Sequence, residues 1–340
     1  MANSSFPNSV FHRKTAKQST IAVNTPSIEP AAQVFVRRWV WKMAFATLAL
    51  MAVGSATRVM NAGLACPDWP LCYGQLVPTA QMNLQVFLEW FHRMDASLIG
   101  LMAIGLVGLS VWYRKVLPGW MPGAAVAALF LIVVQGVLGG LTVMELLRFD
   151  IVTAHLGTAL IFFCTLLAIA LSLLPYQATG NTGQLPWIGL TATVLVYAQS
   201  IIGGLVASRW AAHQCFGIAD LCNVMNTHIG GVLPPTAAVA FLVFRVWRTP
   251  ALNSYLRVLA NSAGALVLLQ IALGVATLKL RLQVEPLTVC HQTIGAALLG
   301  CLLSFTVLSL RDYRAKPALP LPTSSSQQQV EQPVEQQVVS

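Results

Sequence analysis

Eight long apolar stretches, separated by short polar breaks, dominate the sequence. A helix needs about 20 apolar residues to cross the hydrocarbon core of a bilayer, and each stretch meets or approaches that length. A membrane β-barrel would instead show alternating segments of about 10 residues. We therefore predict an all-α integral membrane protein with eight transmembrane helices. These are expected at residues 39–60, 86–113, 123–144, 151–174, 187–207, 224–247, 256–278 and 287–310.

The charged residues are too few for a water-soluble protein of this length. Asp, Glu, Lys and Arg make up only 9% of the 340 residues, against about 25% in a typical soluble domain. The formal net charge of +9 would suit a nucleic-acid partner only if the basic side chains were gathered on one soluble face. Here they lie between the apolar stretches, which argues against both a soluble enzyme and a nucleic-acid-binding protein.

The placement of the basic residues predicts the orientation of the chain. If the N-terminus is cytoplasmic, 14 of the 20 Lys and Arg residues fall in cytoplasmic segments, so the positive-inside rule places both termini in the cytoplasm. The polar tail, residues 1–36, lacks the short apolar core of a cleavable signal, which makes the first span a retained signal anchor. An organelle transit peptide is the weaker alternative, because the tail is rich in Ser and Thr but poor in Arg. The C-terminal tail, residues 315–340, has the composition of a disordered segment.

An internal repeat divides the membrane part into two units. His92 and His155 are 63 residues apart, and His228 and His291 are again 63 residues apart. The four spans that carry these histidines run in the same direction, so the imidazoles should lie at one depth near the outer leaflet. A same-direction repeat places the pseudo-symmetry axis along the membrane normal. We predict two pseudo-symmetric four-helix bundles, at residues 37–180 and 181–314.

Histidines at membrane depth are costly and usually face the bundle interior in a functional role. A single one could merely be hydrogen-bonded across helices, but four at a repeated spacing favour another interpretation. Two histidines on parallel helices can bind opposite faces of a haem. Zinc would need further ligands in each unit, and a proton relay would not need two equal pairs. Glycines near these positions, among them Gly139, Gly203 and Gly274, either admit a ring or serve ordinary helix packing.

One acidic residue breaks the repeat. Glu89 lies three residues before His92, on the same helix face, whereas Met225 stands at the matching position before His228. Glu89 could be a polar anchor at the membrane interface. As a functional residue, it would move protons or stabilise a developing positive charge. Three arginines at the outer ends of the spans could pair with haem propionates or simply extend to the interface: Arg58, Arg93 and Arg209.

The cysteines separate into outer-loop pairs and span residues. Two pairs, six and seven residues apart, lie in the loops after the first and fifth spans, where pairing within each loop is the simplest interpretation in an oxidising compartment. A redox-active first pair is the alternative. The expected disulfides are Cys66–Cys72 and Cys215–Cys222, while Cys164, Cys290 and Cys301 fit small core residues.

The sequence resembles the haem A synthase family over about residues 36–312. The resemblance is carried by Glu89-Trp90-Phe91-His92-Arg93, the other three histidines and the two loop cysteine pairs. It implies oxidation of the C8 methyl of haem O to a formyl group, which yields haem A for terminal oxidase assembly. It also implies a bacterial plasma-membrane location, and redox activity of the first cysteine pair in some members. A complex with haem O synthase or with oxidase assembly factors would fit this role.

The same resemblance assigns the site residues. It places haem O, the substrate, in the first unit with Glu89, His92 and His155. It places a haem b cofactor in the second unit, with His228 and His291 as the iron ligands.

Two other functions fit part of the pattern. A bis-histidine cytochrome b that only passes electrons would explain four histidines but would give Glu89 no role. A transporter of haem or of another small molecule is compatible with the repeat alone. Only the enzyme would produce a formyl haem, so extracted pigments distinguish the three.

Overall fold

A computed structural model of the chain describes residues 29–208, 219–281 and 283–315. Nine α-helices and one short 3-10 helix make up the regular structure of these residues, with no β-strand among them. Eight candidate membrane spans are present, which confirms the predicted all-α membrane protein. The helices are α1 (Ala31–Val59), α2 (Leu84–Trp112), α3 (Met121–Met144), α4 (Phe149–Ser172), α5 (Leu185–Ser208), α7 (Ala219–Gly230), α8 (Leu233–Arg248), α9 (Ser254–Lys279) and α10 (Glu285–Arg314), and the 3-10 helix is η1 (Thr79–Gln81).

Side-chain caps and prolines mark where several helices begin. The Asn83 side chain accepts a hydrogen bond from the Val86 amide at the start of α2, and Asn253 does the same for Tyr255 at the start of α9. Such caps satisfy amides that have no partner in the first helical turn. Helix α1 begins at Ala31, inside the segment that we predicted to be a polar tail ending at residue 36. Its first two turns are amphiphilic rather than apolar, so hydropathy alone placed its start too late.

The sixth span contains a break that the sequence analysis did not predict. A single helix was expected at residues 224–247, but α7 ends at Gly230 and α8 begins at Leu233. Glycine is a poor helix former, and the following Pro234-Pro235 pair lacks backbone N–H groups, which is tolerated only in a first turn. The chain therefore stops one helix and starts another just after His228.

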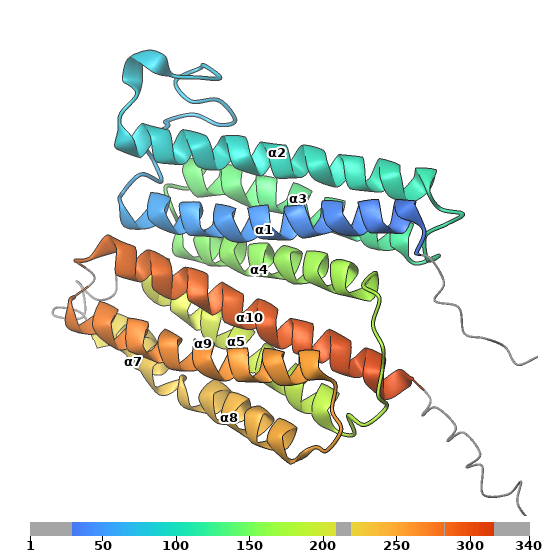
Figure 1. The fold of residues 1–340 in the computed structure, drawn as a ribbon. Helices are drawn as coiled ribbons and strands as arrows, with labels where there is room; N and C mark the ends of the chain where they lie inside the picture. The colour runs from blue at the N-terminus through green and yellow to red at the C-terminus, as the bar shows by residue number, and fades with distance from the viewer. Residues whose placement is uncertain (1–28, 209–218, 282, 316–340) are drawn as a thin grey trace, which may run out of the picture.

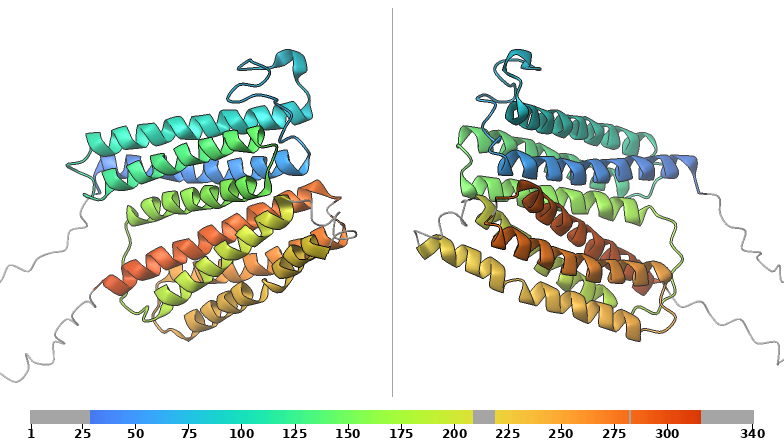
Figure 2. Two further views of the ribbon diagram at one scale, coloured as in Figure 1. Left: turned by 180° about the vertical axis from the view of Figure 1, so that it is seen from behind. Right: turned by 60° about the vertical axis from the view of Figure 1, so that its left-hand side comes forward.

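The helices form two adjacent groups (Figures 1 and 2). We call α1–α4 the first half and α5–α10 the second half. Helices α4 and α10 lie side by side where the two groups meet. They are the most buried of the eight spans, whereas α3 and α9 lie at the periphery.

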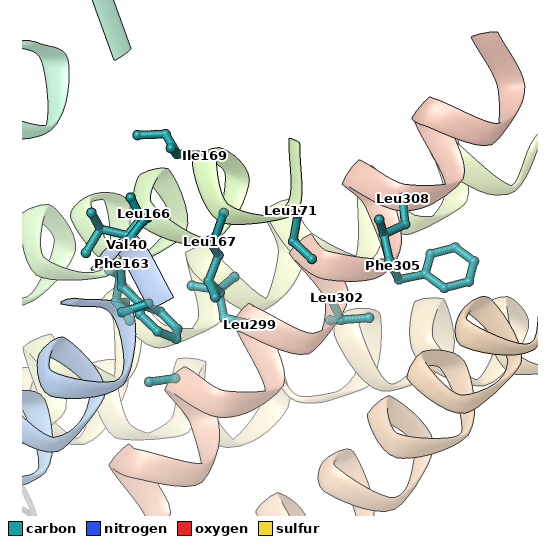
Figure 3. Packing of buried hydrophobic residues seen from close by; sticks show 14 of the residues in the cluster. Val40, Phe163, Leu166, Leu167, Ile169, Leu171, Leu299, Leu302, Phe305 and Leu308 are labelled. Atoms are coloured by element: carbon teal, nitrogen blue, oxygen red, sulfur yellow. The ribbon is translucent and has the colours of Figure 1, made fainter. Parts of the chain in front are cut away.

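The apolar core extends through both halves and crosses this junction (Figure 3). Phe163 and Leu167 of α4 pack against α10, where a Cβ atom on Gly300 would lie only 2.8 Å from the Phe163 ring. Gly300 therefore sets the close approach of the two central helices. Phe305, further along α10, is fully buried in the same core.

A polar cluster closes the junction at the end of α10. The Asp312 carboxylate is fully buried and accepts hydrogen bonds from the Tyr176 hydroxyl at 2.9 Å and the Thr179 amide at 3.1 Å. Gly180 also donates its amide to this carboxylate. The linker between the two halves is thus held by the last helix of the chain.

Candidate functional site

Each of the four predicted histidines packs against a glycine on a neighbouring helix. A Cβ atom on Gly54 of α1 would lie 2.8 Å from Cε1 of His92, and the same distance separates Gly203 of α5 from His228. The corresponding distances are 3.4 Å between Gly139 and His155 and 3.0 Å between Gly274 and His291. The glycines therefore leave room for the imidazole rings. Gly139, Gly203 and Gly274 had been singled out from the sequence as positions of close approach, and Gly54 had not.

The two histidines of the second half face each other closely. The ring centres of His228 and His291 are 6.4 Å apart, and the ring planes are nearly perpendicular at 89°. Metal–imidazole bonds are about 2 Å long, so two rings that ligate one ion from opposite sides have centres roughly 6 Å apart. The Nδ1 atom of His291 is buried without a hydrogen-bond partner. This pair fits bis-histidine ligation of one haem iron.

The two histidines of the first half are also brought together. His92 on α2 and His155 on α4 are near enough to interact electrostatically. The Nδ1 atoms of both rings are buried and have no hydrogen-bond partner in the described part of the chain. Buried polar atoms normally have partners, so unpartnered imidazole nitrogens fit a site for a group that the protein binds.

Glutamine side chains contact three of these histidines, and the sequence analysis missed this role. In the second half, Gln199 and Gln270 approach the rings of His228 and His291. In the first half, the Gln135 side chain donates to the backbone carbonyl of His155 at 2.9 Å. Gln135 and Gln270 stand at matching positions of the repeat in the sequence, but neither they nor Gln199 had been assigned a role from the sequence.

Glu89 is buried one turn before His92, with only 4% of its surface exposed. One carboxylate oxygen pairs with the Arg93 guanidinium at 2.5 Å, and the other accepts the Cys66 amide at 2.8 Å. It is therefore not an exposed anchor at the membrane interface. An ionised acid in such surroundings needs a charged or hydrogen-bonding partner, and here it has both.

The arginines predicted to pair with propionates have different surroundings. Arg93 also donates to the carbonyls of Asp68 at 2.6 Å and Leu71 at 2.5 Å, so its guanidinium is engaged by the loop between α1 and α2. Arg58, at the end of α1, donates to the side-chain oxygen of Gln292 at 3.0 Å. That contact crosses from the first half to the residue next to His291. Arg209 lies outside the described residues.

A disulfide closes the loop that covers this end of the first half. Cys66 and Cys72 are bonded to each other and buried, as predicted, and the loop projects from the end of the bundle where α2 begins (Figure 1). The Asp68 carboxylate accepts the amides of Gly74 at 2.8 Å and Tyr73 at 2.6 Å. These hydrogen bonds, chiefly that from Gly74, lower the pKa of Asp68.

The same loop reaches helix α3. Its Trp69 ring would lie 3.1 Å from a Cβ atom on Gly140, the residue after the glycine that admits His155. The loop thus rests on the end of the first half that carries its two histidines.

The remaining cysteines and the metal-binding side chains restrict the chemistry further. Cys215 and the side chain of Cys222 fall outside the described residues, so the second predicted disulfide stays a prediction. Cys164, Cys290 and Cys301 are free thiols.

No group of three or more His, Cys, Asp or Glu side chains gathers in the described segments, so these segments offer histidine pairs rather than a zinc-type ligand set.

Comparisons with known proteins show which family the chain is similar to. A family model described as "Cytochrome oxidase assembly protein" matches residues 37–303. The chain is 26% identical over 307 residues to a protein from Shewanella oneidensis named "Heme A synthase", an alignment that covers 74% of this chain and 90% of that protein. It is 27% identical to the "Heme A synthase" of Rhodospirillum centenum, with 84% and 91% covered. It is 28% identical to the human "Heme A synthase COX15", with 82% of each chain covered.

Proposed function

The chain belongs to the family of cytochrome oxidase assembly proteins, and we propose that it is a haem A synthase, a multi-pass membrane oxidoreductase that converts haem O to haem A. The observation that carries this proposal is the difference between its two histidine pairs. One pair lies beside the buried acid Glu89, and the other has no acid at the matching position. Such a difference suits an enzyme that oxidises one haem and uses a second as a redox cofactor, because an acid beside the substrate can act in proton transfer or charge stabilisation.

We assign the cofactor site to His228 and His291. Their ring separation of 6.4 Å fits a pair of residues that would hold one haem b iron. When bound there, haem b would supply one-electron redox chemistry. The protein's contribution would be to hold the two rings facing each other, with Gly203 and Gly274 leaving room for them.

We assign the substrate site to His92 and His155, with haem O bound near the outer leaflet and its hydroxyethylfarnesyl tail between helices. Each oxidation step at the C8 methyl releases two electrons and two protons. Glu89 would accept a proton or stabilise positive charge at the methyl carbon. Its pairing with Arg93 and with the Cys66 amide supports this role, because these contacts hold the carboxylate in one position while they balance its charge.

The proposed arrangement in the membrane follows from the same assignment. Residues 37–180 form the substrate half and residues 181–314 the haem b half, related by a pseudo-two-fold axis along the membrane normal. Both termini lie in the cytoplasm, and the histidine end of the bundle faces the outer side of a bacterial plasma membrane. A partner that supplies haem O, or an oxidase assembly factor, would meet the substrate half.

Replacing Glu89 with Ala tests the function. The variant and a Met225→Ala control are expressed beside a source of haem O, and the extracted pigments are analysed for a formyl haem. We expect Glu89→Ala to retain haem b while haem A production stops, and Met225→Ala to produce haem A as the unaltered protein does. Normal haem A output from Glu89→Ala would overturn the role of Glu89. An absence of formyl haem from the unaltered protein would instead favour a cytochrome b that only passes electrons.

A further inference from the structure

Two glutamine amides contact the imidazole rings of the second half. The amide nitrogen of Gln199 lies 3.0 Å from Nδ1 of His228 and donates to the His228 carbonyl at 2.6 Å. The amide nitrogen of Gln270 lies 3.4 Å from Nε2 of His291. In each ring an amide thus meets one nitrogen and leaves the other available to a ligand. A terminal amide offers both a donor and an acceptor, so it can partner an imidazole nitrogen in either protonation state.

Two glycines make room for these amides. A Cβ atom on Gly231 would lie 2.5 Å from the side-chain oxygen of Gln199, and one on Gly295 would lie 3.1 Å from the amide nitrogen of Gln270. Both glycines follow the histidine of their own span. In the first half, the positions that match these glycines hold Asp95 and Ala159. Both residues have a side chain at the place where a glycine leaves room for an amide in the second half.

Among the described residues, no side-chain amide contacts the rings of the first half, where the backbone of Leu50 meets His92 and the backbone of Gln135 meets His155. The residue that matches Gln199, four positions before the glycine facing the histidine, is Leu50. Gln135 matches Gln270, but its described hydrogen bond is to the backbone carbonyl of His155. The Nδ1 atoms of His92 and His155 have no hydrogen-bond partner among the residues described.

We propose that Gln199 and Gln270 are positioning residues that fix the His228 and His291 rings for permanent retention of a haem, and that the first half omits these contacts so that its haem can leave. This inference rests on the proposed function, in which one half keeps a cofactor while the other exchanges a substrate for a product. A hydrogen-bond partner on the second nitrogen of a ligating histidine fixes the ring orientation, and losing such a partner typically lowers metal affinity about 10–100-fold.

The test compares three single substitutions in the full-length protein, purified in detergent with haem bound. Gln199→Leu and Gln270→Leu remove the ring contacts, and Gln135→Leu removes the matching contact to a carbonyl. Haem loss to excess apomyoglobin is followed by absorbance, and the low-spin electron paramagnetic resonance signal and the midpoint potential are recorded. We expect the first two variants to lose haem about 10–100-fold faster, with a shifted signal and potential. Gln135→Leu should keep the wild-type values of the second-half haem.

A gain-of-contact variant makes the same test without removing a native contact. Leu50→Gln combined with Asp95→Gly gives the first half the pair that Gln199 and Gly231 form in the second. We expect slower release of the haem bound at His92, measured by the same transfer assay. An unchanged release rate in this double variant, with wild-type haem loss and signals in Gln199→Leu and Gln270→Leu, would overturn the inference.

The outcomes separate this inference from the proposed function. If the wild-type haem depends on His228 but not on either glutamine, only the positioning role fails. If His228→Ala leaves the haem content and the low-spin signal of the protein unchanged, the cofactor assignment itself fails.

Discussion

The two halves place the same element, a histidine against a glycine, in different surroundings. In the first half, His92 lies beside the buried Glu89 and beneath a loop closed by a disulfide. In the second half, His228 lies against the Gln199 amide, with Met225 where the acid would be. The ion pair places a charged carboxylate beside the first ring, whereas a neutral amide contacts the second ring without adding charge. A duplicated scaffold can therefore acquire two roles through the residues around its ligands while the ligands stay the same.

The largest difference between the two halves is expected when one of the proposed haem-binding histidines is replaced. His228→Ala should abolish the low-spin haem spectrum of the purified protein, because one of the two proposed iron ligands is lost. His92→Ala should leave that spectrum in place while haem A formation stops. Absorption spectra of the two variants, with gel filtration as a check of folding, test the assignment. A spectrum that survives in His228→Ala, or that disappears equally in both variants, would contradict it.

The facing glycines offer a second test. Gly203→Ala and Gly54→Ala each place a methyl group where only 2.8 Å separates it from an imidazole carbon. Overpacking of this kind costs about 1–3 kcal/mol, which corresponds to roughly 5- to 150-fold weaker haem retention. We expect Gly203→Ala to weaken retention of haem b and Gly54→Ala to slow haem A formation with haem b unaffected. Equal effects of the two substitutions on haem b content would show that the halves do not act separately.

Removing the disulfide should affect one half alone. The Cys66→Ser and Cys72→Ser double variant frees the loop that supplies the Cys66 amide to Glu89 and two carbonyls to Arg93. A charge-assisted hydrogen bond contributes about 1.5–3 kcal/mol, so we expect haem A formation to fall by at least tenfold. The midpoint potential of haem b should not change. A shift in that potential would indicate that the loop also influences the second half.

The smallest effect is expected from removing the hydrogen bonds that the Asp68 carboxylate accepts within this loop. Asp68→Asn removes the ionised acceptor of the Gly74 and Tyr73 amides, and the disulfide should become a few-fold more sensitive to a phosphine reductant at neutral pH. Because the pKa of Asp68 is lowered in the folded protein, its contribution is present above the unfolded pKa of about 4 and is lost as the pH falls through the lower folded value. The wild type and the variant should thus differ at pH 7 and converge in strong acid. A difference that persists below the folded pKa would contradict this explanation.

The sequence allowed prediction of the features that repeat or that follow from hydropathy. The eight spans were predicted because a bilayer demands long apolar helices, and Glu89 was found because the second half breaks the repeat at that position. The partners of Arg93 could not be predicted, because they are backbone carbonyls whose positions depend on the path of a disulfide-closed loop. The role of Gln199 was missed for a related reason. Its partner His228 lies on another helix, so the contact can be recognised only when the packing of the helices is known.

The helix break after Gly230 could have been predicted from the sequence. The Gly230-Gly231 and Pro234-Pro235 pairs stand in the sequence, but the overall hydropathy of the span outweighed them. The break lies directly after His228 and next to Gly231, which makes room for the Gln199 amide. Local helix breakers inside a membrane span thus mark the site as well as the boundary.

The carboxylate of Asp312 has a consequence for how the protein is made. It lies three residues from the end of the last described stretch, yet it accepts the amides of the linker that joins the halves. A ribosome that synthesises the chain from the N-terminus delivers this acceptor after the other described helices have been synthesised. The halves can gather their own helices early, but their connection is completed last, so a transcript truncated only a few codons before Asp312 would leave the linker amides without their acceptor.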